Sequence, residues 1–328
     1  MKKAIVLLSV LLIFCLAFSA CGDNTSNNGD TSATKKPTAT ATSSVEPTAK
    51  PTAEPPKNVN VHVFVEDILY SHVVEVKYND EITTWDRLST LDPTLGYDKE
   101  EFSLDFTVPN DGTEAELTAV IRENAPYKIT GWGGDFTADG DTIKFTPAGK
   151  TIFLTVKIEP LYDNVALNST VTSSVSTVEY EEGRWGMACL TDGDVNTRFS
   201  TATLQTVDPE TMMLPEPVTI DIDLTEAKSF DTLCLIPRVD TVDVDDGVPC
   251  FPSAFEVLLS NDGTEYSSVL SVDAEENVDS MMQIYAFAQQ SAQYLRIKVT
   301  RVGTQAADEG VANPYRVQFA ELLLFDAE

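Results

Sequence analysis

The sequence predicts an all-β protein with two β-sandwich domains, which follow an export signal and a linker. Three observations predict this organisation. Apolar and polar residues alternate over short segments, which is the period of a half-buried strand. Clusters of Gly, Pro, Asn and Asp separate these segments, as turns do. No segment combines a helical period with helix start and stop signals, so a βαβ unit is not expected.

Residues 1–20 have the features of an export signal. Lys2 and Lys3 precede the apolar run AIVLLSVLLIFCLAF, and the small residues Ser19 and Ala20 come directly before Cys21. The run is shorter than the roughly 20 apolar residues of a membrane span. The cysteine resembles that of the bacterial lipoprotein box, which implies lipid (palmitate) on Cys21 and a place on the extracellular face of the cell membrane. The alternative is ordinary secretion with an unmodified cysteine.

Composition excludes several classes of function. The net charge of -30 becomes -32 without residues 1–20, which carry two lysines and no acid. Such an acidic surface repels phosphate backbones and anionic headgroups, so we expect no nucleic-acid partner and no membrane contact beyond a lipid anchor. The cysteines that remain after Cys21 are Cys189, Cys234 and Cys250, which allow at most one disulfide. A hydrophobic core must therefore hold the fold.

Residues 21–58 are rich in Asn, Ser, Thr and Pro and are expected to be a disordered linker, because they can bury little apolar surface. Residues 59–160 are expected to form an antiparallel, immunoglobulin-like sandwich that acts as a spacer. Its segments 97–121 resemble the cadherin-like modules of bacterial surface proteins. The predicted strands are 59–65, 102–108 and 152–158, and the predicted turns are 109–112, 133–134 and 138–141.

Residues 161–328 are expected to form the second sandwich. Their segments NVALNSTVTSS, LTDGDVNTRFS, VTIDIDL, LIPRVD, FPSAFEVLLSNDGTEY, AQYLRIKVT and YRVQFAELLLF occur in the order seen in discoidin domains. This region resembles that family, also called coagulation-factor 5/8 type C, which includes the family 32 carbohydrate-binding modules. The resemblance implies a galactose-binding-like jelly roll with a shallow ligand site in the loops at one end. It also implies non-catalytic binding of sugars, cell-surface glycans or lipid headgroups.

Two features of the second sandwich point to a bound cation. Asp192 and Asp194 flank a glycine that permits a sharp bend, although an ordinary turn explains this motif as well. Glu321 shares the strand phase of apolar neighbours in VQFAELLLF, and an unpaired buried carboxylate is costly. A cation beside Glu321 would offset that cost. The alternative is a twist or bulge that brings Glu321 to solvent.

The resemblance to discoidin-type sugar modules implies that this cation is a structural calcium ion. Hard cations such as calcium bind six to eight oxygen ligands. Carried over by position, the ligands are the carbonyl oxygens of Cys189, Asp194 and Ala320 and the side chains of Asp192, Thr197 and Glu321.

Candidate sugar-binding residues lie in three segments of the second sandwich. Shallow sugar sites combine an aromatic face with a few placed polar groups. The candidates are Trp185, Arg238, Asp240, Phe251 and Tyr315. Arg238 matches an arginine of sugar-binding relatives. In the alternative interpretation, Trp185, Phe251 and Tyr315 belong to the core, and Arg238 pairs with the acidic loop that follows it.

No catalytic arrangement is visible in the second sandwich. It has no histidine, which argues against a Ser–His triad and His-ligated zinc. Galactose-binding relatives often add a histidine, so the resemblance argues against galactose as the ligand without excluding another sugar. Adjacent acids such as Glu181 and Glu182 are expected to be solvated rather than a glycosidase pair. We therefore expect a non-catalytic surface lipoprotein that binds carbohydrate through a calcium-stabilised module. The alternative is an adhesive or structural protein whose second sandwich contacts a protein or the cell wall.

Overall fold

The computed structural model describes residues 55–85, 103–179, 183–204, 206–238, 248, 250–273, 278–303, 305 and 315–327. Within these ranges the regular structure is β, apart from the short 3-10 helices η1 (Ile68–His72) and η2 (Ala188–Leu190). The all-β fold class predicted from the sequence is therefore confirmed. No helix in the described ranges is long and apolar enough to cross a membrane. The predicted export signal, Cys21 and nearly all of the linker lie outside the described residues.

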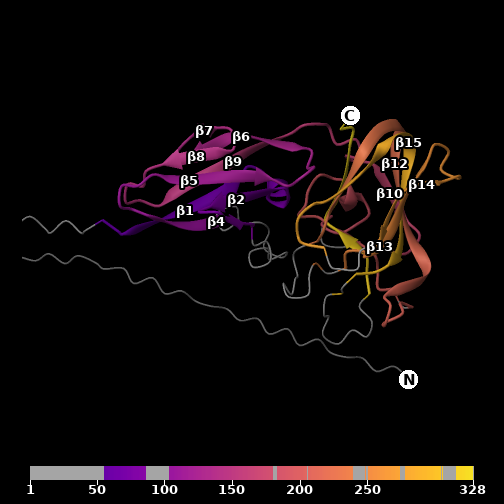
Figure 1. Ribbon diagram of the computed structural model, residues 1–328. Coiled ribbons are helices and arrows are strands. Elements are labelled where there is room, and N and C mark those ends of the chain that lie inside the picture. The colour runs from indigo at the N-terminus through magenta and orange to yellow at the C-terminus, as the bar shows by residue number, and fades with distance from the viewer. Residues whose placement is uncertain are drawn as a thin grey trace, which may run out of the picture. The chain divides into compact units, whose positions relative to one another are not determined.

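The first nine strands build a sandwich of two sheets (Figure 1, indigo to magenta). One sheet has the order β4-β1-β9-β6-β7 and the other has the order β3-β2-β5-β8. The strands are β1 (Asn58–Val65), β2 (Val74–Tyr78), β3 (Glu81–Thr83), β4 (Leu104–Pro109), β5 (Ala115–Ile121), β6 (Tyr127–Gly134), β7 (Ala138–Asp139), β8 (Thr142–Phe145) and β9 (Ile152–Pro160).

The predicted alternation holds in this sandwich. In β1, β4 and β9, every second residue is buried and its neighbours are partly or fully exposed. Two expectations were wrong. Strands β1 and β9 pair in parallel, from Val61 opposite Ile152 to Val65 opposite Val156, so the sandwich is not purely antiparallel. Residues 133–134 do not form a turn but end strand β6, where Gly134 has a φ of 101°.

The remaining strands form an antiparallel system. The main sheet has the order β10-β12-β15-β13-β14, β17 pairs with the end of β12, and β11 pairs with β16. The strands are β10 (Thr170–Ser173), β11 (Phe199–Ser200), β12 (Met213–Ile236), β13 (Ala254–Ser260), β14 (Ser267–Asp273), β15 (Gln283–Arg301), β16 (Gln318–Phe319) and β17 (Glu321–Phe325).

Strands β12 and β15 are unusually long, with 24 and 19 residues, and β12 pairs with different strands along its length. Their pairing shifts register between Asp223 and Lys228, next to Thr225, whose φ is 72°. Before this irregularity β12 pairs with β10, and after it β12 pairs with β17. Residues 218–224, which lie before the irregularity, and residues 232–236, which lie after it, are therefore parts of one strand.

Candidate functional site

The loop that joins η2 to β11 is held by its own polar side chains. Asp192 Oδ1 accepts a hydrogen bond from the Asp194 amide at 2.9 Å, and Asp194 Oδ1 accepts one from the Asn196 amide at 2.9 Å. Gly193 has a φ of 82°, a backbone conformation that favours glycine. The turn interpretation of this motif is thus satisfied locally, whatever else the loop binds.

The same loop gathers oxygen atoms around the Thr197 hydroxyl. Thr197 Oγ1 lies 2.8 Å from Asp192 Oδ2, 2.9 Å from the Asp194 carbonyl oxygen and 3.4 Å from the Cys189 carbonyl oxygen. These are four of the six groups that the sequence predicts as calcium ligands. All four groups belong to residues 189–197, which contain the end of η2 and the turn that follows it.

Glu321 brings the last strand to this loop. Its side chain is buried, with an exposed fraction of 0%, as its strand phase predicts. Glu321 Oε2 accepts a hydrogen bond from the Gly193 amide at 2.9 Å, and Oε1 accepts one from the Leu322 amide at 3.3 Å. The alternative in which a bulge carries Glu321 to solvent is therefore excluded. The predicted continuity of the strand is not observed, because Ala320 separates β16 from β17.

The carboxyl group of Glu321 is disfavoured in its ionised form by its surroundings, which include Asp192. Burial, followed by the nearby charge of Asp192, raises the pKa of Glu321 to about 9. Burial also raises the pKa of Asp192. No lysine or arginine contributes to either shift. A cation near both groups would favour their ionised forms.

The donor set suits a hard cation. It consists of two carboxylates, one hydroxyl and backbone carbonyls, and calcium and magnesium prefer oxygen ligands of these kinds. Among the described residues, no group of three or more His, Cys, Asp or Glu side chains is placed to hold a metal. Any ion here would thus depend on the carbonyl and hydroxyl oxygens. The Ala320 amide donates to the Ile236 carbonyl at 2.8 Å, which fixes the backbone beside Glu321.

Trp185 and Arg238 meet, but they meet in the interior. The guanidinium carbon of Arg238 lies 4.8 Å from the centre of the Trp185 ring, and that of Arg198 lies 5.5 Å from it. Trp185 is only 7% exposed and Arg238 only 8%. Neither side chain is therefore open to solvent, and two arginines lie against the indole ring.

A polar chain continues from Arg238 into the core. Arg238 Nη1 donates to Gln318 Oε1 at 2.7 Å, and Gln318 Nε2 donates to Ser200 Oγ at 2.9 Å. Both Gln318 and Ser200 are fully buried. Sequence analysis missed Arg198, Gln318 and Ser200. The signal available for Gln318 was a polar residue inside the apolar run of the last strands.

The two other predicted ligand residues in the described part of the chain, Phe251 and Tyr315, pack against the core. Phe251 is 3% exposed and packs edge-to-face on Phe319, with ring centres 5.4 Å apart, which agrees with the alternative interpretation of Phe251 as a core residue. Tyr315 is half-buried against the core, and its carbonyl accepts a hydrogen bond from the Leu204 amide at 2.8 Å. Asp240 lies outside the described residues.

A cavity of about 390 Å³ opens near Tyr315, between the end of β10 and the start of β12. Its lining combines apolar side chains with several hydroxyl groups and one carboxylate. The lining residues are Val175, Ser176, Ala202, Thr203, Leu204, Thr206, Leu214, Pro215, Glu216 and Val218. None of them was among the predicted ligand residues.

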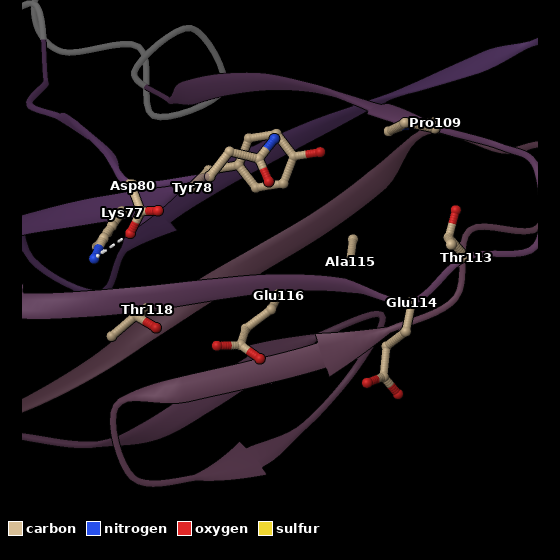
Figure 2. A pocket seen from close by; sticks show the side chains of 10 residues that line it. Lys77, Tyr78, Asp80, Pro109, Thr113, Glu114, Ala115, Glu116 and Thr118 are labelled. Carbon is tan, nitrogen blue, oxygen red and sulfur yellow. Dashed lines mark ion pairs between the residues drawn. The ribbon is translucent and has the colours of Figure 1, made fainter.

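A second cavity, of about 430 Å³, lies on the first sandwich at the β2–β3 turn and the start of β5. Figure 2 shows its lining, in which Lys77 and Asp80 form an ion pair of 2.9 Å. Glu116, on the same lining, pairs with Lys144 at 2.6 Å. The charges that line this cavity are thus largely neutralised by side chains of the same sandwich.

Comparison with known proteins identifies the second sandwich. Residues 170–311 match the family described as F5/8 type C domain. No curated protein matches the chain. Similar solved structures include a Clostridium perfringens family 32 module in complex with GalNAc-β-1,3-galactose, at 18% identity and a TM-score of 0.34. That match covers 48% of this chain and 95% of the module.

Another similar structure is chitosan-binding module 2 of a chitosanase/glucanase from Paenibacillus sp. IK-5, in complex with chitotriose. It is 21% identical, has a TM-score of 0.35, and the match covers 49% of this chain and 99% of the module. Strands β10 to β15 lie within the range that the family matches. The chain therefore contains an F5/8 type C, or discoidin, domain over residues 170–311.

Proposed function

We propose that this protein is a non-catalytic surface lipoprotein that binds carbohydrate through its discoidin domain, with calcium as a structural ion. The observation that carries the proposal is the family match over residues 170–311. The discoidin family implies a ligand site in the loops at one end of the jelly roll. The acidic composition, with a net charge of -30, favours a neutral or cationic glycan over an anionic one.

The cavity beside β10 and β12 supports a ligand site at that end of the domain. Small-molecule sites are concave, mostly apolar, and carry a few polar groups that fix orientation. Leu204, Leu214 and Val218 supply the apolar surface, and Thr206 and Glu216 supply polar groups at the rim. In this proposal Trp185 and Arg238 do not contact the sugar but support the loops around it.

The structural calcium ion is proposed to join the loop 189–197 to strand β17. The support is the cluster of oxygen atoms around Thr197 and the proximity of the buried Glu321 carboxyl group to the half-buried Asp192. When bound, the ion would supply positive charge between Asp192 and Glu321. The chain's own residues would fix its position, because the Gly193 amide already holds Glu321 against the loop.

A glycan array tests the binding site. We expect Leu214→Ala and Glu216→Ala to lose at least tenfold in binding to any glycan that the unmodified protein retains. The matched control is Met213→Ala, because Met213 is 43% exposed, precedes Leu214 and does not line the cavity. Equal binding by all three variants would contradict this site. Binding to cell-surface proteins but to no glycan would favour the adhesive alternative.

A further inference from the structure

The end of β12 and strand β17 are buried on both faces. In an exposed sheet, one face packs on the core and the other meets water. Here all five residues of β17 and the last seven of β12 are buried. The sequence shows the same feature as two continuous apolar runs, TLCLI and LLLF, in place of alternation.

The two faces of these strands belong to different hydrophobic clusters. Residues on one face pack in the core of the discoidin domain, and these are Leu233, Leu235, Leu322 and Leu324. The alternate residues are no more than 4% exposed and pack in the cluster that fills the first sandwich, and these are Cys234, Ile236, Leu323 and Phe325. The first sandwich thus covers the outer face of the β12–β17 pair within the compact unit 54–328.

Aromatic contacts carry this packing. The ring of Phe325 lies edge-to-face with Tyr127, with ring centres 6.0 Å apart. Tyr127 in turn packs edge-to-face on Tyr70 at 5.8 Å. Phe325 is 1% exposed and Tyr127 is 6% exposed, so these rings exclude water from the contact. Aromatic pairs of this kind add to the stabilisation that comes from burying their area.

Polar groups at the edge of the apolar contact fix its position. The Met282 amide donates to the His72 carbonyl at 3.0 Å, and His72 Nδ1 hydrogen-bonds the Ser280 carbonyl at 3.1 Å. His72 is 1% exposed. Beside it, Arg122 pairs with Asp279 at 2.9 Å. Since buried polar groups are costly when unpaired, separation of the two sandwiches would expose or orphan these groups.

We infer that the two sandwiches fold and unfold as one cooperative unit, with the first sandwich as the permanent cover of the β12–β17 face. The spacer expected from the sequence is, in this inference, a structural part of the binding module. Without its cover the discoidin domain would present Ile236, Leu323 and Phe325 to water, and contiguous apolar patches of this kind promote aggregation. The inference does not depend on the identity of the ligand.

Reporters in each sandwich test the cooperativity. Trp85 and Trp132 lie in the first sandwich and Trp185 lies in the discoidin domain, so paired Trp→Phe variants leave Trp132 or Trp185 as the sole fluorophore. The perturbation is Val257→Ala, which creates a cavity in the core of the discoidin domain. We expect the melting midpoint to fall by roughly 5 °C at both reporters. A midpoint that falls at Trp185 and stays constant at Trp132 would overturn the inference.

Thiol reactivity tests the cover under native conditions. A chain that starts at Gly22 contains the whole compact unit and, with Cys189→Ser and Cys250→Ser, keeps Cys234 as its one thiol. Cys234 is 0% exposed on the covered face. The matched control places a thiol on an exposed strand with Ser267→Cys and Cys234→Ser. We expect a maleimide to react with Cys234 more than a hundredfold more slowly than with the control, and a smaller difference would overturn the inference.

Discussion

The protonation state of the buried Glu321 carboxyl group depends on the groups that lie beside it. Its neighbours are apolar side chains, the Gly193 amide and the carboxyl group of Asp192. Without a cation, burial and the charge of Asp192 favour the protonated form. In the proposed calcium-bound form, the same oxygens would be ligands, and both carboxylates could ionise.

The pH dependence of stability tests this description of Glu321. In cation-free protein the native state keeps a proton on Glu321 up to a pKa of about 9, whereas the unfolded state loses it near 4.5. The native state binds more protons between these values, so the free energy of unfolding should fall as the pH rises from about 4.5 to about 9. Urea unfolding at a series of pH values in chelator should show this slope, and Glu321→Gln should flatten it.

Calcium removal tests the proposed ion directly. We expect a chelator to lower the melting midpoint of the unmodified protein, since a ligand at 100 times its Kd stabilises the native state by about 2.7 kcal/mol. Glu321→Gln should respond much less to the chelator. The control is Asp194→Asn, because only the backbone carbonyl of Asp194 is a proposed ligand. An unchanged midpoint in the unmodified protein would rule out a structural calcium ion.

We expect Trp185 to stabilise the folded state. Its ring lies between Arg198 and Arg238 in the interior. Trp185→Ala should therefore lower the free energy of unfolding by about 3–5 kcal/mol, as large-to-small core substitutions do. Urea unfolding checks the loss, and Trp185→Phe should cost less and keep glycan binding. A Trp185→Ala variant of unchanged stability that no longer binds would instead return Trp185 to the ligand site.

At the scale of elements, the glycines of β6 show why this strand escaped prediction. A side chain at Gly134 would place its Cβ 2.2 Å from the Phe153 carbonyl oxygen of β9. The glycine therefore serves a close approach of two backbones, rather than a turn. Pairs of glycines in a sequence favour turns, and only the neighbouring strand reveals the other reason.

A matched pair of substitutions distinguishes the two reasons for a glycine, which are a positive φ and a close approach of another backbone. Gly134 and Gly112 have similar φ values, 101° and 90°, but a Cβ at Gly112 would meet nothing within 4 Å. Both alanine variants carry the backbone strain of a positive φ, about 1–2 kcal/mol. We expect Gly134→Ala to cost clearly more than Gly112→Ala in urea unfolding. Equal costs would contradict the idea that Gly134 is needed for the close approach of β6 and β9.

The strands were predictable because their signal is local. The alternating residues of β1 and β9 appear in the sequence with a period of two, and burial follows it. The bend of β12 near Thr225 and the parallel β1–β9 pair were not predictable, because they depend on register between distant segments. The same limit explains the site: Trp185 is buried beneath Arg238, which comes from elsewhere in the chain and is held by Gln318.

At the scale of the whole molecule, we expect a membrane anchor at Cys21, because this cysteine follows a predicted export signal. In a bacterial host supplied with labelled palmitate, we expect label on the unmodified protein and none on Cys21→Ser. The variant should also move from the membrane fraction to the medium, because its hydrophobic anchor is gone. The control is Cys250→Ser, which alters a cysteine beyond the predicted signal. Label that persists on Cys21→Ser would show that Cys21 is not the acylated residue.

The parallel pairing of β1 with β9 has a mechanical consequence. These are the first and last strands of the first sandwich, and they run in the same direction through five paired positions from Val61 to Val65. A pull between Asn58 and Pro160 drags the strands past each other along their length, so the inter-strand hydrogen bonds share the load instead of opening one at a time. Stretched by an optical or atomic-force probe from these ends, the sandwich should yield in a single high-force rupture, whereas a gradual, low-force extension would show that β1 peels away.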